Sequence, residues 1–315
     1  MRHLTGCCKT TAQADLRPPV LGGPARKPAL LARAAAPRAT FFHRVLLRAA
    51  WLSLALIVPA AYGAELPIFD AHVHYSHDAW DTVPPQAAID LLRKAGVRRA
   101  LVSSSDDDGQ QRLAKLAPDM MLLSLRPYRR RGETGTWVRD PTVLTYLEER
   151  LAKYRYVALG EYHLHGADAD LPVPRGVVEL ARKHNLPLHA HADADAVERH
   201  FAQWPQARII WAHAGFDNPA RVRAMLQKYP TLSCDLSFRT DYVAGGKPTA
   251  PWRALFLEFP DRFMVGSDTY TPERWPYVVE HASWARRWLA DLPPEVAEKI
   301  AWRNGERLFG LAGAQ

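Results

Sequence analysis

Histidines and carboxylates that could bind a metal ion lie near the ends of several strand-like segments of this chain. His72 and His74 follow a largely apolar stretch, and residues i and i+2 of a β-strand point to the same face. Both imidazoles would therefore leave the strand end together, as two ligands of one ion must. The corresponding residues of later segments are Glu161, His189, His191, His213 and Asp268. Imidazole combined with carboxylate favours zinc, with manganese, iron or cobalt as alternatives, in a site for one or two divalent ions.

An alternation of strand-like and helix-like segments positions these side chains. We predict eight strands, at 68–74, 99–103, 120–125, 156–161, 188–192, 208–213, 231–236 and 263–268. Helical spacing separates them, as at 86–95 and 219–229, and further helices follow Pro272 and Pro294. Eight such units over roughly 250 residues are typical of a (β/α)8 TIM barrel of the α/β class, here with extra C-terminal helices, whose strand ends form one rim.

An open doubly wound sheet is the alternative architecture. Such a sheet normally carries a glycine-rich phosphate loop after its first strand. The residues that follow His74 are Tyr75 and Ser76, and no such loop is present. The sequence therefore favours the barrel.

The net charge of this 315-residue chain is concentrated at its N-terminus. The formal net charge is +8, but residues 1–64 hold nine Lys or Arg and one Asp. Subtracting these from the totals of 41 and 33 leaves 32 residues of each sign. A neutral remainder excludes nucleic acid as a default partner, and we expect a small-molecule substrate, with a homo-oligomer left open.

Residues 1–64 have the pattern of an export signal. Arg44 and Arg48 precede an apolar run over 49–61, which is too short to span a membrane and is followed by small residues. We expect cleavage after residue 63 or 64, export to a bacterial periplasm and no stable membrane association afterwards. An uncleaved N-terminal anchor is the alternative. The mature domain, 65–315, then keeps one cysteine, Cys234, and cannot form an internal disulfide.

Four ordered segments resemble the signatures of the amidohydrolase superfamily. They are 69–74 (FDAHVH), 186–191 (LPLHAH), 209–215 (IIWAHAG) and 265–268 (VGSD), and the ending 304–310 (NGERLFG) is similar too. The resemblance covers 66–311 and is strongest to the amidohydrolase-related branch, which contains metal-dependent hydrolases and non-oxidative decarboxylases. It implies that His72, His74 and His191 are metal ligands.

The same resemblance implies roles for residues of the later strands. His213 would bind a second metal or polarise the substrate, and Asp268 would bind metal and take the proton from the attacking water. Gly160 and Glu161 resemble the deoxyribonuclease-like relatives rather than the members that use a modified lysine on the fourth strand. We expect Glu161 to reach the metal and to bridge two ions, the alternative being a carboxylate that holds a ligand histidine or a loop arginine.

Arginines and further histidines lie where a substrate should bind. The candidates for substrate contact are Arg126, Arg129, His163, His189 and Arg239. A guanidinium pairs with a carboxylate or phosphate through two hydrogen bonds, although a solvated loop is the alternative for most of the arginine run. His189 has the alternative of a buried, hydrogen-bonded histidine, and Asp235 is expected to be a structural hydrogen-bonding group.

The predicted activity is hydrolysis by a metal-activated water of an ester, lactone, amide or phosphoester bond in a small, anionic substrate. A metal-dependent non-oxidative decarboxylase on the same barrel is the first alternative. A non-catalytic metal- or ligand-binding barrel is the second. A serine hydrolase is disfavoured, because the serines at 103–105 lack a Gly-x-Ser-x-Gly frame.

Overall fold

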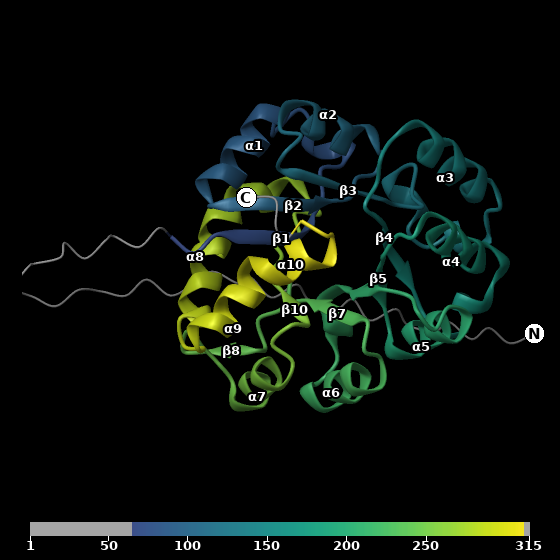
Figure 1. The fold of residues 1–315 in the computed structure, drawn as a ribbon. Coiled ribbons are helices and arrows are strands. Elements are labelled where there is room, and N and C mark those ends of the chain that lie inside the picture. The colour runs from purple at the N-terminus through teal and green to yellow at the C-terminus, as the bar shows by residue number, and fades with distance from the viewer. Residues whose placement is uncertain (1–64, 312–315) are drawn as a thin grey trace, which may run out of the picture. The chain divides into compact units, whose positions relative to one another are not determined.

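Eight parallel strands form the centre of the molecule (Figure 1). The computed structural model describes residues 65–311, so the predicted export signal in 1–64 lies outside the described residues. The strands are β1 (Ile68–Val73), β2 (Val97–Val102), β3 (Met121–Leu125), β4 (Ala158–Leu164), β5 (Leu188–Ala192), β6 (Ile209–Trp211), β7 (Leu232–Asp235) and β10 (Phe263–Met264). They pair in this order, and two backbone hydrogen bonds join the ends of the sheet, Ala71 N to Val265 O (2.9 Å) and Asp268 N to His72 O (2.7 Å). The predicted (β/α)8 barrel is confirmed.

Helices surround this barrel, one after most strands (Figure 1). They are α1 (Pro85–Lys94), α2 (Asp108–Leu116), α3 (Thr142–Lys153), α4 (Pro172–His184), α5 (Ala194–Gln203), α6 (Pro219–Lys228), α7 (Ala250–Glu258) and α8 (Val278–Leu289). Local sequence signals set their ends: Pro85 and Pro172 occupy first turns, Asp193 caps α5 by accepting from Ala196 N, and Asn185 ends α4 with a positive φ of 53°. A short hairpin, β8 (Val243–Ala244) with β9 (Lys247–Pro248), follows β7.

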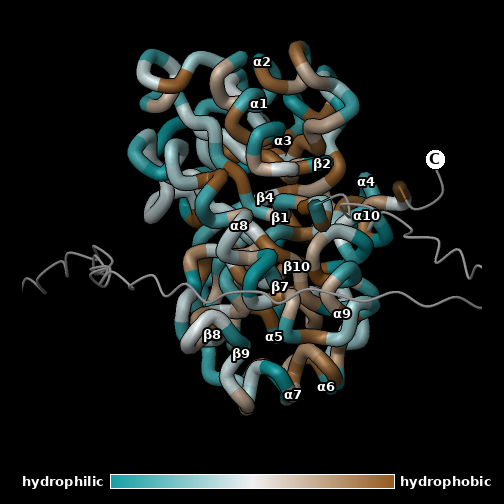
Figure 2. Tube along the Cα trace, turned by 90° about the vertical axis from the view of Figure 1, so that its left-hand side faces the viewer, coloured by the Kyte–Doolittle hydropathy of each residue, from teal (hydrophilic) through white to brown (hydrophobic). Residues whose placement is uncertain are grey.

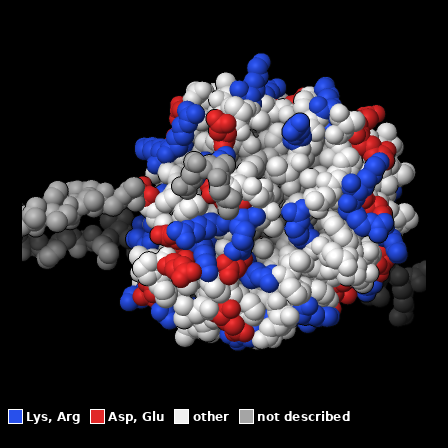
Figure 3. All heavy atoms as spheres, in the orientation of Figure 1, with Lys and Arg blue, Asp and Glu red and all other residues white. Residues whose placement is uncertain are grey.

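The predicted C-terminal helices close one end of the barrel. α9 (Pro294–Glu298) and α10 (Asn304–Leu308) follow α8, and α10 lies across the barrel's centre in Figure 1. Phe309, which follows α10, stacks on Phe69 of β1 with ring centroids 5.9 Å apart. Charges of both signs are interspersed on this face (Figure 3). A substrate must therefore enter from the opposite end, where the strands terminate.

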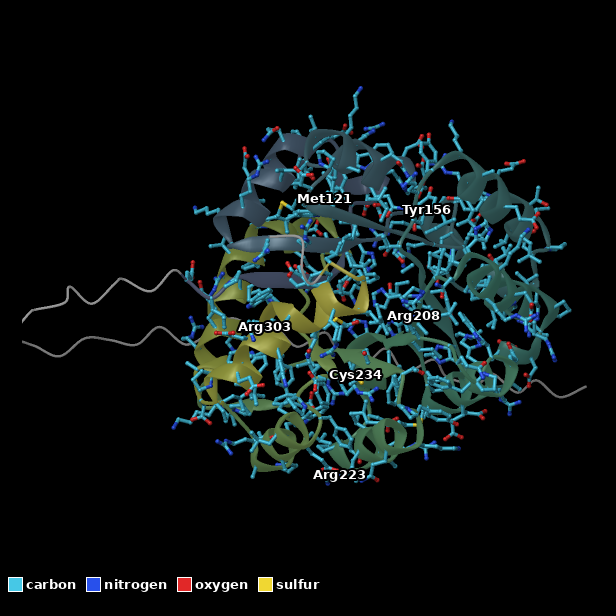
Figure 4. All side chains as sticks on the ribbon, viewed as in Figure 1. Met121, Tyr156, Arg208, Arg223, Cys234 and Arg303 are labelled. Atoms are coloured by element: carbon cyan, nitrogen blue, oxygen red, sulfur yellow. The ribbon has the colours of Figure 1, made fainter. Side chains whose placement is uncertain are left out.

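Apolar side chains fill the space between strands and helices, and Figure 2 shows the hydrophobic residues running along the strands. Cys234 is buried on β7, whereas Arg223 projects from α6 at the outer edge (Figure 4). Within the described part of the chain, no helix has the length and apolar character needed to cross a membrane.

Three predicted carboxyl-terminal strand ends were wrong by more than one residue, and each of these errors lies beside the candidate site. β4 continues to Leu164 and so includes His163. β6 ends at Trp211, because the chain then turns with left-handed φ angles. β10 ends at Met264; the residues after it still hydrogen-bond to β1, and the chain turns away at Asp268, which has a left-handed φ of 51°.

Candidate metal centre

The two histidines of β1 form the middle of a buried polar cluster at the carboxyl ends of the strands. Nε2 of His72 lies 3.0 Å from Nε2 of His74. Glu161 of β4 reaches both, with Oε2 3.2 Å from His74 Nε2 and Oε1 3.5 Å from His72 Nε2. Oδ1 of Asp268 lies 3.4 Å from His74 Nε2 and 3.8 Å from His72 Nε2. Alternation along β1 and the turn after β10 thus place four predicted ligands within one small volume.

Two further histidines approach the same glutamate from the other side. His191, on β5, places Nδ1 2.9 Å from Glu161 Oε1. His213, just after β6, places Nε2 3.7 Å from the same oxygen. The structure therefore brings together all six residues that the sequence proposes as ligands, which are His72, His74, Glu161, His191, His213 and Asp268.

Acceptors around the cluster fix which ring nitrogens carry protons. Nδ1 of His72 faces Oδ2 of Asp235 at 3.2 Å, and Nδ1 of His74 and of His213 face the carbonyl oxygens of Ser103 and Ser237, each at 2.8 Å. A carboxylate or carbonyl oxygen only accepts, so each Nδ1 donates and each Nε2 presents its lone pair to the centre.

This arrangement fits a divalent cation. Two lone pairs facing each other at 3.0 Å, on His72 and His74, repel unless a metal ion or a proton lies between them. Oδ1 of Asp268 is buried and has no hydrogen-bond partner among the described residues. Outer acceptors that orient ligand imidazoles are usual around protein-bound metals. Asp235 has the structural role expected of it, whereas Ser237 and the Ser103 carbonyl were missed, since no sequence pattern marks them.

The electrostatics of the cluster also favour added positive charge. Burial lowers the pKa of His72, but Asp235, Glu161 and Asp268 outweigh it and hold that pKa well above its usual value. Burial raises the pKa of Glu161, but His72 and its other imidazole partners outweigh it and hold that pKa well below its usual value. Arg126 is the nearby fixed cation, with Nη2 donating to Glu161 Oε2 at 3.0 Å.

The backbone is strained at Asp268 and His213, the candidate ligands that follow β10 and β6. Asp268 has φ 51°, and φ is 56°, 45°, 64° and 53° at the four consecutive residues His213, Ala214, Gly215 and Phe216. A left-handed conformation costs a non-glycine residue on the order of 1–2 kcal/mol. At Gly215 a Cβ atom would lie 2.1 Å from the Trp211 ring, so only glycine fits there. Strain of this kind concentrates at functional sites, where the surrounding contacts enforce it.

A pocket of about 300 Å³ opens onto the cluster. It is lined by His74, Ser76, Ser105, Arg126, Tyr128, Arg131, Thr134, Glu161, His163, His191, His213, Phe216, Phe238, Asp268 and Tyr270. Phe216, Phe238 and Tyr270 are 49, 47 and 41% exposed and form one apolar wall. Phe238 packs edge-on against both of the others, with centroids 6.3 and 5.5 Å apart. Sequence reasoning missed this wall, although two of its rings follow His213 and Asp268 by two or three residues.

Two of the predicted substrate contacts do line the pocket. Arg126 is buried, and its guanidinium also donates from Nε to the Glu161 carbonyl at 3.1 Å. These contacts match the alternative for Glu161, a carboxylate that holds a loop arginine and a histidine, while its reach to a metal ion stays a prediction. His163 stacks on His191 with centroids 4.0 Å apart, and its Nδ1 lies 3.0 Å from the Tyr128 hydroxyl.

The structure places the other three predicted contacts outside the pocket. Arg129 is engaged by Glu133 and Asp140, within its own loop. Arg239 is buried against Asp241 and backbone carbonyl oxygens. His189 lies beneath the centre, with Nε2 3.0 Å from Asp235 Oδ2, which agrees with its alternative as a buried, hydrogen-bonded histidine. None of these three lines the pocket, so none is placed to contact substrate.

Comparison with known sequences decides the family. The family model described as Amidohydrolase matches residues 69–311. The chain belongs to this family. The resemblance inferred from the sequence motifs is thereby confirmed, including the amidohydrolase-related branch. A search of curated proteins gave no match.

Several solved structures share the fold at low sequence identity. A TIM-barrel protein from Bordetella bronchiseptica superposes with a TM-score of 0.57 at 13% identity, covering 79% of this chain and 100% of its own. A TatD homologue from Escherichia coli K12 gives 0.51 at 17% identity, covering 78% and 99%. A putative 2-pyrone-4,6-dicarboxylic acid hydrolase from Pseudomonas putida gives 0.50 at 16% identity, covering 79% and 99%.

Family membership and the buried histidine–carboxylate cluster together establish the class of activity. The amidohydrolase is an enzyme of the metal-dependent hydrolase type, in a group whose chemistry is hydrolysis or decarboxylation of small molecules. The choice between hydrolysis and decarboxylation depends on the geometry of the site.

Proposed function

We propose that this amidohydrolase uses two divalent ions, bridged by Glu161, to hydrolyse an ester, lactone, amide or phosphoester bond of a small anionic substrate. The observation that carries the proposal is the position of the Glu161 carboxylate. Its Oε2 lies 3.2 Å from His74 Nε2, while its Oε1 lies 2.9 Å from His191 Nδ1 and 3.7 Å from His213 Nε2. A carboxylate between two groups of imidazole ligands suits a pair of ions.

The donors divide into two groups around this glutamate. His72, His74 and Asp268 would hold one ion, and His191 and His213 would hold the other, with Glu161 shared. Zinc is the proposed metal, because it accepts nitrogen and oxygen ligands together. Such ions, when bound, acidify water and polarise a carbonyl or phosphoryl oxygen.

The chain's own residues supply proton transfer and orientation. Asp268 is the proposed general base, because its carboxylate faces the centre beside both histidines of β1 and a carboxylate can accept a proton. Asp268 and His213 are held in left-handed conformations by surrounding contacts, so both start close to a productive orientation. If only one ion binds, His213 is left to polarise the substrate.

The pocket supports a small anionic substrate. Arg126 and Arg131 are the cationic side chains of its lining; Arg126 pairs with Glu161, and Arg131 pairs with Asp78, which does not line the pocket. His163 lines the same pocket. The apolar wall across the pocket would pack against the uncharged part of the substrate and exclude water. We also propose, on the sequence pattern of residues 1–64, that the enzyme is exported to a bacterial periplasm.

Elemental analysis of the enzyme purified without chelator tests the bridge. We expect two ions per chain in the wild type and one in Glu161→Gln, because an amide cannot bridge two cations as a carboxylate does. Glu133→Gln is the matched control, since Glu133 is also a buried glutamate paired with an arginine but lies outside the pocket. Equal metal content in wild type and Glu161→Gln would contradict the bridge, and no metal after addition of zinc or manganese would contradict the metal centre.

Product analysis then separates the two reactions of the family. A panel of esters, lactones, amides and phosphoesters should give hydrolysis products, with activity that depends on added metal. Release of CO2 from a carboxylic acid, with no hydrolysis, would support the decarboxylase alternative. Metal binding with no turnover of either panel would support the non-catalytic alternative.

A further inference from the structure

Four consecutive left-handed residues, His213 to Phe216, connect β6 to the pocket. This turn does two things at once: it aims His213 at the centre and it places the Phe216 ring on the pocket wall. The two rings stack, with centroids 4.6 Å apart and planes at 19°. Residues other than glycine rarely adopt this conformation, so contacts from outside the turn must maintain it.

Arg239 donates hydrogen bonds to two carbonyl oxygens of the turn and to that of the next residue, Asp217. Its Nη1 donates to the carbonyls of His213 (3.0 Å) and Ala214 (3.4 Å), and its Nη2 donates to the carbonyl of Asp217 (2.8 Å). Asp241 fixes the guanidinium from behind, accepting from Nε at 2.8 Å and from Nη2 at 2.6 Å.

The surroundings of Arg239 hold it in this one position. Its side chain is 3% exposed, and the guanidinium carbon lies 4.5 Å from the centroid of the Trp252 ring. A planar guanidinium with five donors can serve three carbonyls and a carboxylate at the same time, whereas a lysine ammonium has three donors on one atom.

We propose that Arg239 is a positioning residue that holds the 213–216 turn, and thereby fixes His213 at the metal centre and Phe216 in the pocket wall. The arginine acts through the turn and not on the substrate. Its consequence for turnover rests on the proposed function of His213, but the mechanical part, stabilisation of the turn, does not.

Amide hydrogen exchange of residues 213–217 tests the mechanical part directly. We expect exchange to accelerate at least tenfold in Arg239→Ala, because the carbonyl oxygens of His213, Ala214 and Asp217 lose their contacts with the guanidinium. Arg262→Ala is the matched control, since Arg262 donates to the carbonyl of Leu232 (3.0 Å) at the opposite end of β7. Unchanged exchange in Arg239→Ala, or an equal change in Arg262→Ala, would overturn the proposal.

Kinetics and chemical rescue test the consequence for turnover. On any substrate that the wild type hydrolyses, Arg239→Ala should lower kcat by about 100-fold through misplacement of His213, with a smaller change in KM. Added guanidinium should restore part of kcat and slow the exchange of 213–217, while Arg239→Lys should restore neither. Exchange that guanidinium does not slow would count against the proposal.

A second variant and the exchange measurement separate the role of Arg239 from folding failure and from failure of the proposed function. If Arg239→Ala does not fold, Asp241→Asn weakens the same clamp from its exposed side and should give a smaller acceleration of exchange; no acceleration would overturn the proposal. If the wild type hydrolyses nothing, the proposed function fails while the exchange measurement still decides the role of Arg239.

Discussion

Replacing Asp235 by asparagine should weaken metal binding without touching a ligand. Oδ2 of Asp235 accepts from His72 Nδ1 (3.2 Å) and His189 Nε2 (3.0 Å). Oδ1 accepts from His213 N (3.2 Å), Ser237 N (3.0 Å) and Ser237 Oγ (2.5 Å). The side chain is fully buried, so no water replaces a lost acceptor.

An amide can satisfy only one side of this arrangement. If its oxygen takes the place of Oδ1, its NH2 group faces two imidazole N–H groups. His72 then relieves the conflict by moving its proton to Nε2, the atom that faces the centre, and loses the lone pair needed for a metal. Loss of such an outer partner typically lowers metal affinity 10–100-fold. We expect the upper end, about 100-fold or ~2.7 kcal/mol, because the tautomer of a ligand changes.

Competition with a chromogenic chelator measures this affinity. Asp107→Asn is the matched control, because Asp107 is a buried carboxylate that accepts from Tyr156 (2.7 Å) in a network on α2 and α3, away from the centre. The control should lose thermal stability but keep its metal affinity. Affinity in Asp235→Asn within threefold of the wild type would refute the assignment of the Nδ1 protons.

Two further predictions concern the base and the stability of the barrel. Asp268→Asn should lower kcat by about 10²–10⁴-fold, the usual contribution of a general base, and loss of less than tenfold in steady-state kinetics would contradict its role. Burial lowers the pKa of His200 to about 4 from 6.5. Between pH 6.5 and 4 the unfolded chain therefore binds a proton at this histidine that the folded chain does not bind. The free energy of unfolding falls by about 3 kcal/mol as the pH falls through this range. His200→Gln should flatten the pH dependence of urea unfolding in this range, and an unchanged pH dependence would show that His200 does not cause it.

The common rim of the candidate ligands could be predicted because strand geometry relates their positions, whereas their roles as ligands came from the family resemblance. Alternation puts His72 and His74 on one face of β1, and parallel strands bring Glu161, His191 and Asp268 to the same rim. The barrel followed from the count of alternating elements for the same reason. These inferences use only local periodicity, which the sequence displays directly.

Which arginines face the pocket could not be predicted, because this depends on the path of the loops that carry them. Arg129 and Arg239 follow strands as a substrate clamp should, yet each meets an acidic partner a few residues away, Glu133 and Asp241 respectively. No periodicity indicates whether a loop folds back on its own arginine or opens it to the pocket. The same limit applies to the ends of β6 and β10, where closure of the barrel and the left-handed turns override the apolar pattern.

The left-handed turn and the Nδ1 contacts of His72 and His213 have a common origin in the segment 235–239, at the end of β7. Asp235 orients His72, the Ser237 carbonyl orients His213, and Arg239 holds the turn that carries His213. Alternate residues over five positions thus control two imidazoles that belong to other strands. Sequence motifs identify the imidazoles, but the segment 235–239 fixes their tautomers and directions. We therefore expect substitutions in this segment to change metal affinity and kcat more than substitutions of pocket-lining residues that contact neither histidine.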